Sequence, residues 1–581
     1  MKFDDFLHTI NDFGQYQKLR YFCICLTYML PPVMVYTWSF AAATPSFRCK
    51  LYENDSVYDN HIPVFYNQSQ PDETYCKANM KISIRECQRC YMKTMSTNGE
   101  VRIQPCEDYV FDRKYHQYTL VEEWLMVCDR TIFRSTVQNL FFVGYMVGSI
   151  FFGIMADKYG RRPIMSICII LMACTGFICA FFPQKNIFGF WPSYLVYTIS
   201  RFILACSTRG IAVTGFVLAT ELVGPKNKFL TAIIVQYFFA FGQLFLVVFA
   251  YFIREWRRLT ITLSIFTIPF TFFYFVLPES ARWMISKRHY KKAENLLRKI
   301  AETNKRTFDE EMFQQLINTQ EKNTTDKQLE VGVLALFQSK IMCIISINLF
   351  FQWFVQNLVF YGISQSTGSW GFNPYLSFTI SACVEILSYI VLHLVLNRIG
   401  RKRPYFIAVF CFAIIALLTI PAQNIMLKNS QRQKVLIFLM NLLLKFFAAG
   451  SYAIIYIYAN ELFPTGIRNT GMGICSMVAR IGAIVGTTSN DILTRLWVNL
   501  PTVLFGILSL FAAFLVLMLP ETLNRTLPQT IEDTEQMGLT CTCVRDNQRT
   551  SKQDGQTNIK KDDDLNEDQL LNESLKRIDD S

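Results

Sequence analysis

The stretch Asp157-Lys-Tyr-Gly-Arg-Arg162 returns in altered form as Asn397-Arg-Ile-Gly-Arg-Lys402, 240 residues further along the chain. Each copy stands between two apolar segments and has a glycine, Gly160 or Gly400, at its centre. Glycine permits the tight turn that two adjacent helices need. Each copy therefore predicts a helical corner, and the spacing indicates two related halves.

Two further pairs of motifs keep nearly the same spacing. Ala-Thr-Glu221-Leu is matched by Ala-Asn-Glu461-Leu, also 240 residues later, and Pro-Glu-Ser at 278–280 is matched by Pro-Glu-Thr at 520–522, 242 residues later. Three independent motifs at one spacing are hard to obtain by chance and indicate an internal repeat.

The composition places this repeat in a membrane. Of 581 residues 51% are hydrophobic and 18% charged, whereas soluble proteins carry about 25% charged residues. This argues against a soluble enzyme and a disordered chain. The formal charge is +12, but the basic residues form short clusters beside apolar runs, which indicates membrane topology rather than nucleic-acid binding.

A bilayer-spanning helix needs roughly 20 apolar residues. Twelve segments qualify: 21–43, 137–156, 164–182, 193–220, 229–252, 259–277, 340–362, 374–396, 404–423, 435–459, 470–490 and 501–519. We therefore expect an all-α membrane protein with twelve transmembrane helices in two pseudo-symmetric six-helix halves. Transporters of the major facilitator type are built this way, with the substrate site between the halves.

The predicted organisation follows from these spans. It comprises a cytoplasmic N-terminus (1–20) without the apolar core of a signal peptide, an N-terminal half (21–277) with an extracellular loop (44–136), cytoplasmic linker helices (278–339), a C-terminal half (340–528) and a disordered cytoplasmic tail (529–581). The basic clusters after the second and eighth spans put both termini in the cytoplasm of a plasma-membrane protein. One loop disagrees, since Arg254, Arg257 and Arg258 fall outside.

The first outer loop carries an even number of cysteines. They are Cys49, Cys76, Cys87, Cys90, Cys106 and Cys128, and two glycosylation sequons lie at Asn54 and Asn67. In an oxidising compartment six cysteines predict three disulfides, in any of 15 connectivities. A metal site at Cys87-x-x-Cys90 is the alternative.

The repeated motifs supply charged residues for a gate. They are Asp157, Arg161, Arg162, Glu221, Glu279, Arg401, Glu461 and Glu521. Pairs among them would hold the cytoplasmic side shut in one state and separate in the other. The alternative is a set of static topology determinants with surface ion pairs of about 0–1 kcal/mol each.

Longer stretches give a family resemblance. They are Glu123-Trp-Leu-Met-Val-Cys-Asp-Arg130, Ala250-Tyr-Phe-Ile-Arg-Glu-Trp-Arg257, Pro278-Glu-Ser-Ala-Arg-Trp283 and Glu461-Leu-Phe-Pro-Thr-Gly-Ile-Arg468. With the long cysteine-bearing loop, they resemble the solute carrier family of organic cation, organic anion and carnitine transporters over about residues 6–535. Asn397 departs from the family's acidic residue in the second gate motif, and the proline usual after Arg480 is absent.

Charged residues within spans are candidates for binding, because each costs roughly 2.5–3.5 kcal/mol at mid-bilayer. They are Arg201, Arg209, Glu385, Lys445 and Arg480; Arg201 lies nearer a span end and suits a structural role. The resemblance implies that Arg480 is shared with anion and carnitine carriers and Glu385 with cation and carnitine carriers. It also implies that the basic residue of anion carriers near Tyr389 is absent. An acid and a base in one cavity suit a zwitterion; alternatively, Glu385 pairs with Arg480 or Lys445 only to neutralise itself.

Aromatic and amide side chains complete the predicted cavity. Trp353 and Phe360 lie on one helix face, with Gln356 and Asn357 between them, and Gln236, Phe239 and Gln243 have matching spacing in the fifth span. The resemblance places both sets at cavity positions. Aromatic rings bind a quaternary ammonium and a bidentate arginine binds a carboxylate.

The predicted function is secondary transport of small organic cations or zwitterions such as carnitine by alternating access. An organic anion carrier is the alternative, favoured by Arg209, Lys445 and Arg480, and opposed by Glu385, for which no counter-charge is obvious. A ligand sensor that does not transport is a remote third. The scattered histidines and the lack of a Walker sequence argue against an enzyme or an ATP-driven pump. No cofactor is expected, and sodium coupling stays open.

Overall fold

The computed structural model describes residues 3–11, 13–50, 55, 71–72, 75–76, 84–95, 101–224, 228–325, 336–425, 431–464, 467–523, 528 and 533–535. Within these residues eleven helical spans are long and apolar enough to cross a membrane, and a shorter apolar helix at Leu500–Val516 makes the twelfth. The predicted all-α fold with twelve membrane helices is confirmed.

Each half supplies six of these spans. In the N-terminal half they are α2 (Gln15–Thr27) with α3 (Leu30–Ala41), α8 (Thr131–Tyr159), α9 (Arg161–Phe181), α11 (Phe190–Leu222), α12 (Lys228–Phe252), and α13 (Trp256–Thr267) continued by η3 (Ile268–Phe272) and α14 (Phe273–Val276). In the C-terminal half they are α18 (Lys340–Ser366), α19 (Pro374–Ile399), α20 (Lys402–Ile425), α21 (Gln431–Leu462), α22 (Arg468–Leu496) and α23 (Leu500–Val516).

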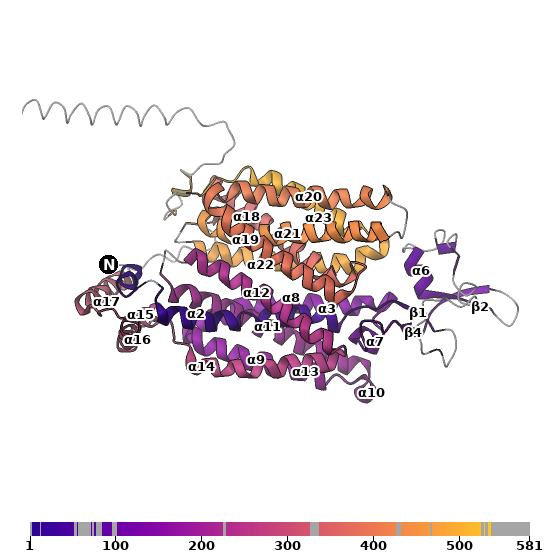
Figure 1. Ribbon diagram of the computed structural model, residues 1–581, viewed down its shortest axis with the longest axis horizontal. Helices are drawn as coiled ribbons and strands as arrows, with labels where there is room; N and C mark the ends of the chain where they lie inside the picture. Colours follow the sequence, from indigo (N-terminus) through magenta and orange to yellow (C-terminus); the bar gives the residue numbers. More distant parts are fainter. Residues whose placement is uncertain are drawn as a thin grey trace, which may run out of the picture.

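The two halves lie side by side with their helices along the long axis of the molecule (Figure 1). Between the halves α8 packs against α22 and α12 against α19. A site between the halves is therefore lined mainly by these four helices and by α18, α21 and α11, which pack on them.

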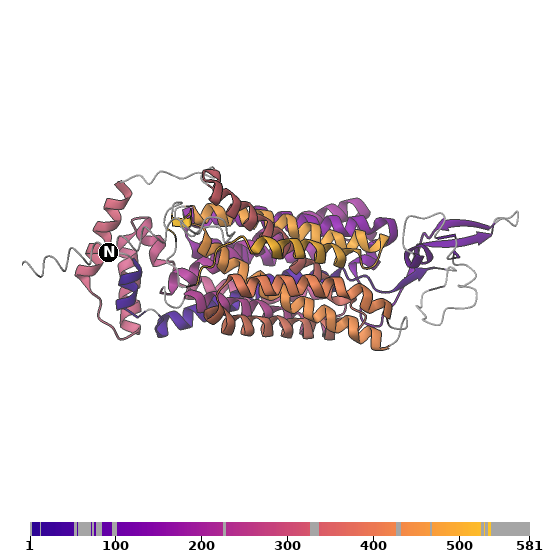
Figure 2. The same ribbon diagram turned by 90° about the horizontal axis from the view of Figure 1, so that it is seen from above.

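The two ends of the bundle carry different structures (Figures 1 and 2). At one end, called the linker end, α1 (Phe3–Thr9) packs with α15 (Ala281–Ser286), α16 (Tyr290–Thr303) and α17 (Glu310–Thr325). The shared core includes Phe6, Leu297 and Phe313. The amide of Asn304 also donates to the carbonyl of Ile10 at 3.1 Å, so the N-terminal segment is fixed to the linker helices.

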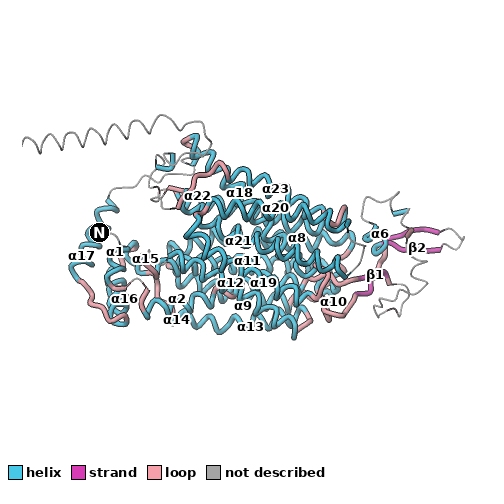
Figure 3. Tube along the Cα trace, turned by 45° about the horizontal axis from the view of Figure 1, so that its top comes forward, coloured by secondary structure: helices cyan, strands magenta, loops and turns pink. Residues whose placement is uncertain are grey.

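The opposite end, called the loop end, carries the cysteine-bearing loop (Figure 3). Its elements are β1 (Phe47–Cys49), α6 (Ile84–Cys90), β2 (Tyr91–Met95), β3 (Val101–Pro105), β4 (Tyr109–Phe111), α7 (Leu120–Trp124) and η1 (Cys128–Arg130), with α10 (Lys185–Phe188) beside them. Strand β1 pairs antiparallel with β4, and β2 with β3.

The predicted disulfides are present. The bonds join Cys49 to Cys106, Cys76 to Cys87, and Cys90 to Cys128. Since Cys87 and Cys90 belong to different disulfides, a metal site between them is ruled out. The sequons at Asn54 and Asn67 and almost all of the tail lie outside the described residues.

Two of the three arginines in the loop that departs from the positive-inside rule are paired with carboxylates. Arg257 donates to Glu123 at 2.5 Å, and Arg258 pairs with Glu255 at 2.7 Å. Trp256 donates to the other oxygen of Glu123 at 3.1 Å. Two of the stretches that carried the family resemblance, 123–130 and 250–257, therefore meet in space, where Glu123 of one pairs with Arg257 of the other.

Candidate functional site

A buried ion pair lies in the middle of the C-terminal half. Glu385 of α19 and Lys445 of α21 have their side chains 0% and 1% exposed, and Nζ of Lys445 lies 2.8 Å from Oε2 of Glu385. Of the two basic partners considered for Glu385, the structure places Lys445 beside it. The expectation that Glu385 has no obvious counter-charge is therefore wrong. The counter-charge comes from α21, and sequence periodicity alone does not show that α21 stands opposite α19.

Both members of the pair have further partners. Oε2 of Glu385 accepts from Gln243 of α12 at 3.1 Å, and Oε1 accepts from the hydroxyl of Tyr389 at 2.9 Å. Lys445 donates to the hydroxyl of Ser364 at 2.6 Å. Because Gln243 belongs to the N-terminal half, this network crosses between the halves.

Arg480 of α22 is buried, and none of the described carboxylates forms an ion pair with it. It is 1% exposed, and its Nη1 lies 3.4 Å from the hydroxyl of Tyr361. Its Nε and Nη2 have no hydrogen-bond partner among the described residues. The guanidinium lies 5.4 Å from the ring centroid of Tyr145 on α8, in the other half. A buried guanidinium with unused donors is suited to an anionic ligand.

Arg209 of α11 approaches the same place from the N-terminal half. Its Nε has no hydrogen-bond partner among the described residues, and its charge acts on Tyr28, Tyr145 and Tyr456. Tyr145 and Tyr456 are electrostatic neighbours of Arg480 as well. Two guanidinium groups from opposite halves therefore converge on shared tyrosines.

Arg201 is placed elsewhere. Its guanidinium lies 5.1 Å from the ring of Trp38 and 4.8 Å from that of Phe141. Trp38 belongs to the apolar cluster nearest the loop end. Its Nε and Nη2, like those of Arg480, have no hydrogen-bond partner among the described residues. The rings of Trp38 and Phe141 nevertheless lie against its guanidinium, which agrees with the structural role expected for Arg201.

Aromatic rings surround the charged groups. Phe360 stacks on Tyr452 with centroids 4.4 Å apart, and Trp353 meets Tyr456 edge-on at 4.3 Å. Nζ of Lys445 lies 4.4 Å from the Phe360 centroid. Trp353 and Phe360 thus face one cluster, as their spacing predicts.

Other predicted cavity residues are less central. Phe239 is half-buried and meets the ring of Tyr36 at 6.4 Å. Gln236 is half-buried on α12. Gln356 accepts from Ser451 at 2.6 Å and so joins α18 to α21, whereas Asn357 donates to the carbonyl of Trp353 at 3.0 Å within α18.

Sequence reasoning missed the tyrosines of this cluster. They are Tyr28, Tyr36, Tyr145, Tyr361, Tyr452 and Tyr456, all within membrane spans. The one available signal was Tyr452 and Tyr456, four residues apart and hence on one helix face.

The repeated motifs form nearly identical braces at the linker end. Gly160 has φ +110° and Gly400 has φ +106°, a backbone region that suits glycine. In one copy Glu279 accepts from the backbone N–H groups of Arg161 and Arg162 at 3.0 and 3.2 Å. In the other, Glu521 accepts from the backbone N–H groups of residues 401 and 402 at 2.8 and 3.1 Å. A carboxylate at a helix N-terminus is stabilised by the helix dipole.

The arginine side chains complete the two braces. Arg161 lies 2.9 Å from Asp157 and 3.4 Å from Glu221, while Arg401 lies 3.1 Å from Glu461. All these pairs stay within one half. The predicted pairs form, and in this state they brace each half; their role as a gate stays a prediction.

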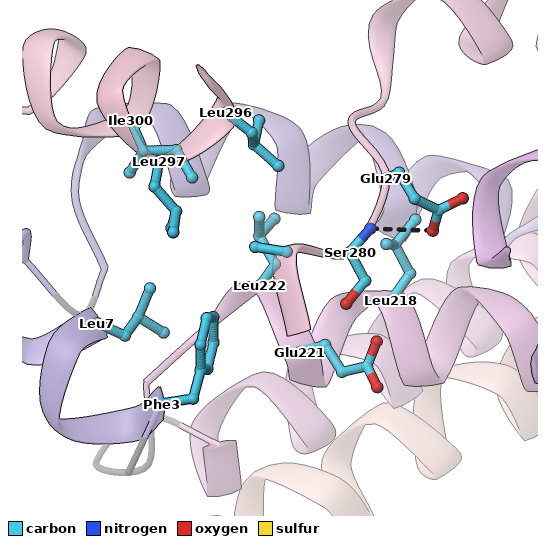
Figure 4. A pocket seen from close by; sticks show the side chains of 11 residues that line it. Phe3, Leu7, Leu218, Glu221, Leu222, Glu279, Ser280, Leu296, Leu297 and Ile300 are labelled. Atoms are coloured by element: carbon cyan, nitrogen blue, oxygen red, sulfur yellow. Dashed lines mark hydrogen bonds between the residues drawn. The ribbon is translucent and has the colours of Figure 1, made fainter. Parts of the chain in front are cut away.

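A small pocket of about 20 Å³ lies behind the first brace, where α1, α11, α15 and α16 meet (Figure 4). Its lining is mostly apolar, and the carboxylates of Glu221 and Glu279 stand at one side. Burial raises the pKa of Glu279, an effect opposed by the N–H groups of Ser280, Arg161 and Arg162. The carboxylates are already engaged in the brace, so the pocket offers little to a charged ligand.

The halves are bonded to one another at the loop end. Asp491 of α22 accepts from Arg134 and Ser135 of α8 at 2.5 and 2.8 Å. Thr488 donates to Asn139 at 2.7 Å. We call these five residues the loop-end latch. Above it, Tyr375 of α19 donates to the carbonyl of residue 115 at 2.7 Å.

Comparison with known proteins agrees with this architecture. The family described as "Sugar (and other) transporter" matches residues 80–533. The chain is 34% identical to the "Organic cation transporter protein" of Drosophila melanogaster over 93% of this chain and 95% of that one. It is 35% identical to the "Organic cation transporter-like protein" of the same organism over 93% of each.

Solved structures agree on the fold. The xylose transporter from E. coli in a partially occluded inward-open conformation has a TM-score of 0.58 at 15% identity, covering 88% of this chain and all of that one. The relatives are transporters and not enzymes. The chain therefore belongs to the sugar (and other) transporter family of the major facilitator superfamily, as a multi-pass membrane transporter of the organic cation and organic anion type.

Proposed function

We propose that this transporter carries small organic solutes that bear a carboxylate, above all zwitterions such as carnitine. The substrate lies between the halves, near Arg480, Arg209, Glu385 and the aromatic cluster. The observation that carries the proposal is Arg480, which is buried between the halves with two donor nitrogens unused by the described residues.

The charge balance of the cluster supports a carboxylate. Glu385 and Lys445 neutralise each other, which leaves the positive charges of Arg209 and Arg480. A carboxylate supplies the missing negative charge and matches the planar fork of a guanidinium. A simple organic cation meets two uncompensated positive charges.

The rings supply the second half of a zwitterion's binding site. A quaternary ammonium on an aromatic face gains about 0.5–2 kcal/mol per ring. Trp353, Phe360, Tyr452 and Tyr456 present such faces within one cluster that also contains Arg480's tyrosine neighbours. Carnitine has both a quaternary ammonium and a carboxylate.

An organic anion carrier is the second candidate. The pairing of Glu385 with Lys445 removes the main argument against it, because Glu385 no longer counts as an unpaired negative charge. A mono-anion without an ammonium satisfies Arg480 equally well and leaves the ion pair undisturbed.

Transport follows from rocking of the halves about this site. The loop-end latch separates as the linker end closes. We further propose that the linker end lies in the cytoplasm of a plasma-membrane protein, with both termini on that side. The basic clusters at this end support the orientation.

The test is uptake of labelled carnitine, benzoate and tetraethylammonium by cells that express the chain, each with and without sodium. Comparing wild type with Arg480→Gln and Arg480→Lys, at matched surface amounts, isolates the guanidinium. We expect Arg480→Gln to lower carnitine and benzoate uptake about 100-fold, since a lost buried ion pair costs about 3 kcal/mol or more. Arg480→Lys should retain part of the carnitine and benzoate uptake.

Equal losses for all three probes would show that Arg480 is structural. Uptake of benzoate without carnitine would favour the anion carrier. Uptake of tetraethylammonium alone would refute the carboxylate site.

A further inference from the structure

The ammonium of Lys445 is surrounded as a bound substrate cation would be. It has a carboxylate oxygen of Glu385 at 2.8 Å, the hydroxyl oxygen of Ser364 at 2.6 Å and the ring centroid of Phe360 at 4.4 Å. A carboxylate and an aromatic face attract both primary and quaternary ammonium ligands, and a hydroxyl can in addition accept a hydrogen bond from a primary ammonium. The side chain is 1% exposed, so this position is fully enclosed.

We infer that Lys445 is a tethered competitor that occupies the cation subsite of the empty carrier. The inference rests on the proposed function, because it takes Glu385 and Phe360 as the place where a substrate's ammonium binds. A solute whose cationic group is to reach Glu385 must first displace Lys445. Lys445 is then a residue that determines specificity.

The competitor selects zwitterions over simple cations. A simple cation that takes Glu385 leaves the ammonium of Lys445 buried without a counter-charge, which is strongly unfavourable in a dry site. A zwitterion brings its own carboxylate, which compensates the positive charge released. Discrimination thus comes from a repulsive element against the wrong substrate as well as attraction for the right one.

The pair also keeps the empty carrier electrically balanced around Glu385. Without a substrate, Glu385 is never left as a bare charge, because Lys445, Gln243 and Tyr389 all bond to it. The empty protein can then return between its two states without moving an uncompensated carboxylate through a low-dielectric interior. Net uptake, rather than obligatory exchange, is the consequence.

The experiment measures binding of labelled tetramethylammonium and carnitine to purified protein in detergent for wild type, Lys445→Met and Lys445→Arg. Methionine keeps the length of the chain and removes the charge. Apparent affinity is reduced by the fraction of sites that are occupied internally, so we expect Lys445→Met to bind tetramethylammonium at least about tenfold more tightly. Lys445→Arg keeps a competing cation at this position and should bind tetramethylammonium as weakly as wild type.

A second readout uses uptake into cells with and without preloaded carnitine. Lys445→Met should become dependent on internal substrate, whereas wild type should not. The double variant Glu385→Gln with Lys445→Met removes both charges, so it folds without a buried unpaired carboxylate. It should not show the gain in tetramethylammonium binding.

Unchanged tetramethylammonium affinity in Lys445→Met, or an equal gain in the double variant, would overturn the inference. Failure of wild type to bind carnitine, together with tighter tetramethylammonium binding by Lys445→Met, would refute the proposed substrate while supporting the competitor. Arg480→Gln is the matched control, because it affects carboxylate binding and not the competition at Glu385.

Discussion

The two ends of the bundle hold the protein together in different ways. At the loop end the latch joins α8 of one half to α22 of the other, through Arg134, Ser135 and Asp491 above all. At the linker end the ion pairs of the repeated motifs stay within one half, as with Arg161 and Glu221. The braces therefore tie helices together within each half, whereas the latch joins one half to the other.

The internal repeat explains why the bonds at the linker end stay within one half and those of the latch do not. The braces occur twice with nearly the same bonds, because a duplicated six-helix unit carries its own corners with it. The latch pairs the beginning of α8 with the end of α22 and has residues of different kinds on its two sides. A contact between two copies need not resemble anything within one copy. We expect the latch, rather than the braces, to change between states.

Breaking the latch should have the largest effect. Asp491→Ala leaves Arg134 without its carboxylate partner, with only the carbonyl of Ala42 still accepting from its Nε, and removes the bond to Ser135, a loss of about 2–3 kcal/mol. We expect the loop end to open about 30- to 150-fold more often. The measurement is maleimide labelling of Phe40→Cys, which is 4% exposed and packs on Tyr375, in a chain without other free thiols.

The control for the latch is Glu255→Ala. Glu255 pairs with Arg258 at the same end but within one half, so labelling of Phe40→Cys should stay at the wild-type rate. Labelling that is unaffected by Asp491→Ala would show that the latch does not hold the loop end shut.

Breaking a brace should destabilise the fold without opening it. Glu521→Ala removes the acceptor at the start of α20, which costs about 1–2 kcal/mol. We expect the melting temperature of the purified protein to fall by a few degrees, with unchanged labelling of Phe40→Cys. Glu279→Ala is the matched variant in the other half and should behave alike. Increased labelling in either would mean that the braces also control opening.

Acid should weaken loop-end closure by a smaller amount. Burial, with Arg254 nearby, lowers the pKa of His116 to about 4, opposed by Asp112, and its ring lies 6.2 Å from that of Tyr375. A lowered pKa stabilises the closed form above pH 6.5, and this contribution is lost as the pH falls toward 4. By pH 5.5 the loss is about 1 kcal/mol.

The readout for acid sensitivity is the pH dependence of Phe40→Cys labelling, corrected for the reagent. It should rise severalfold between pH 7 and 5.5 in wild type and remain flat in His116→Gln. The same rise in both proteins would assign the effect to another group.

The smallest effect is expected at the disulfide-bonded loop. Glu86 of α6 pairs with Arg495 of α22 at 3.0 Å across the halves, and both side chains are about one-fifth exposed. A pair of this kind contributes about 1 kcal/mol or less. Glu86→Gln should raise labelling of Phe40→Cys less than fivefold, and an effect as large as that of Asp491→Ala would make the loop part of the latch.

The sequence alone predicts much of the fold for clear physical reasons. Apolar length fixes the spans, paired cysteines in an outer loop indicate disulfides, and the repeated glycine corners indicate where Arg161 and Arg401 lie. The site is predicted only in part. Helical periodicity puts Glu385 on an interior face, but it does not show which helix stands opposite, so Lys445 and Arg480 were equal as partners.

The parts that escaped prediction lack a periodic signal. Tyr145 and Tyr361 are single tyrosines in apolar segments among 27 in the chain, and nothing local separates cavity rings from packing rings. Arg134 and Asp491 stand near the ends of their helices, where charged residues are ordinary. Only the packing of α8 on α22 makes them a latch.

The most direct test of rocking around a carboxylate site follows both ends of one protein at once. Spin-label distances would be measured between Lys158→Cys and Arg398→Cys at the linker end, and between Gln184→Cys and Val498→Cys at the loop end, with and without carnitine. All four positions are exposed. We predict that carnitine shortens the linker-end distance and lengthens the loop-end distance, and that Arg480→Gln abolishes both changes. Distances that carnitine leaves unchanged in the wild type, under conditions where it binds, would contradict the account.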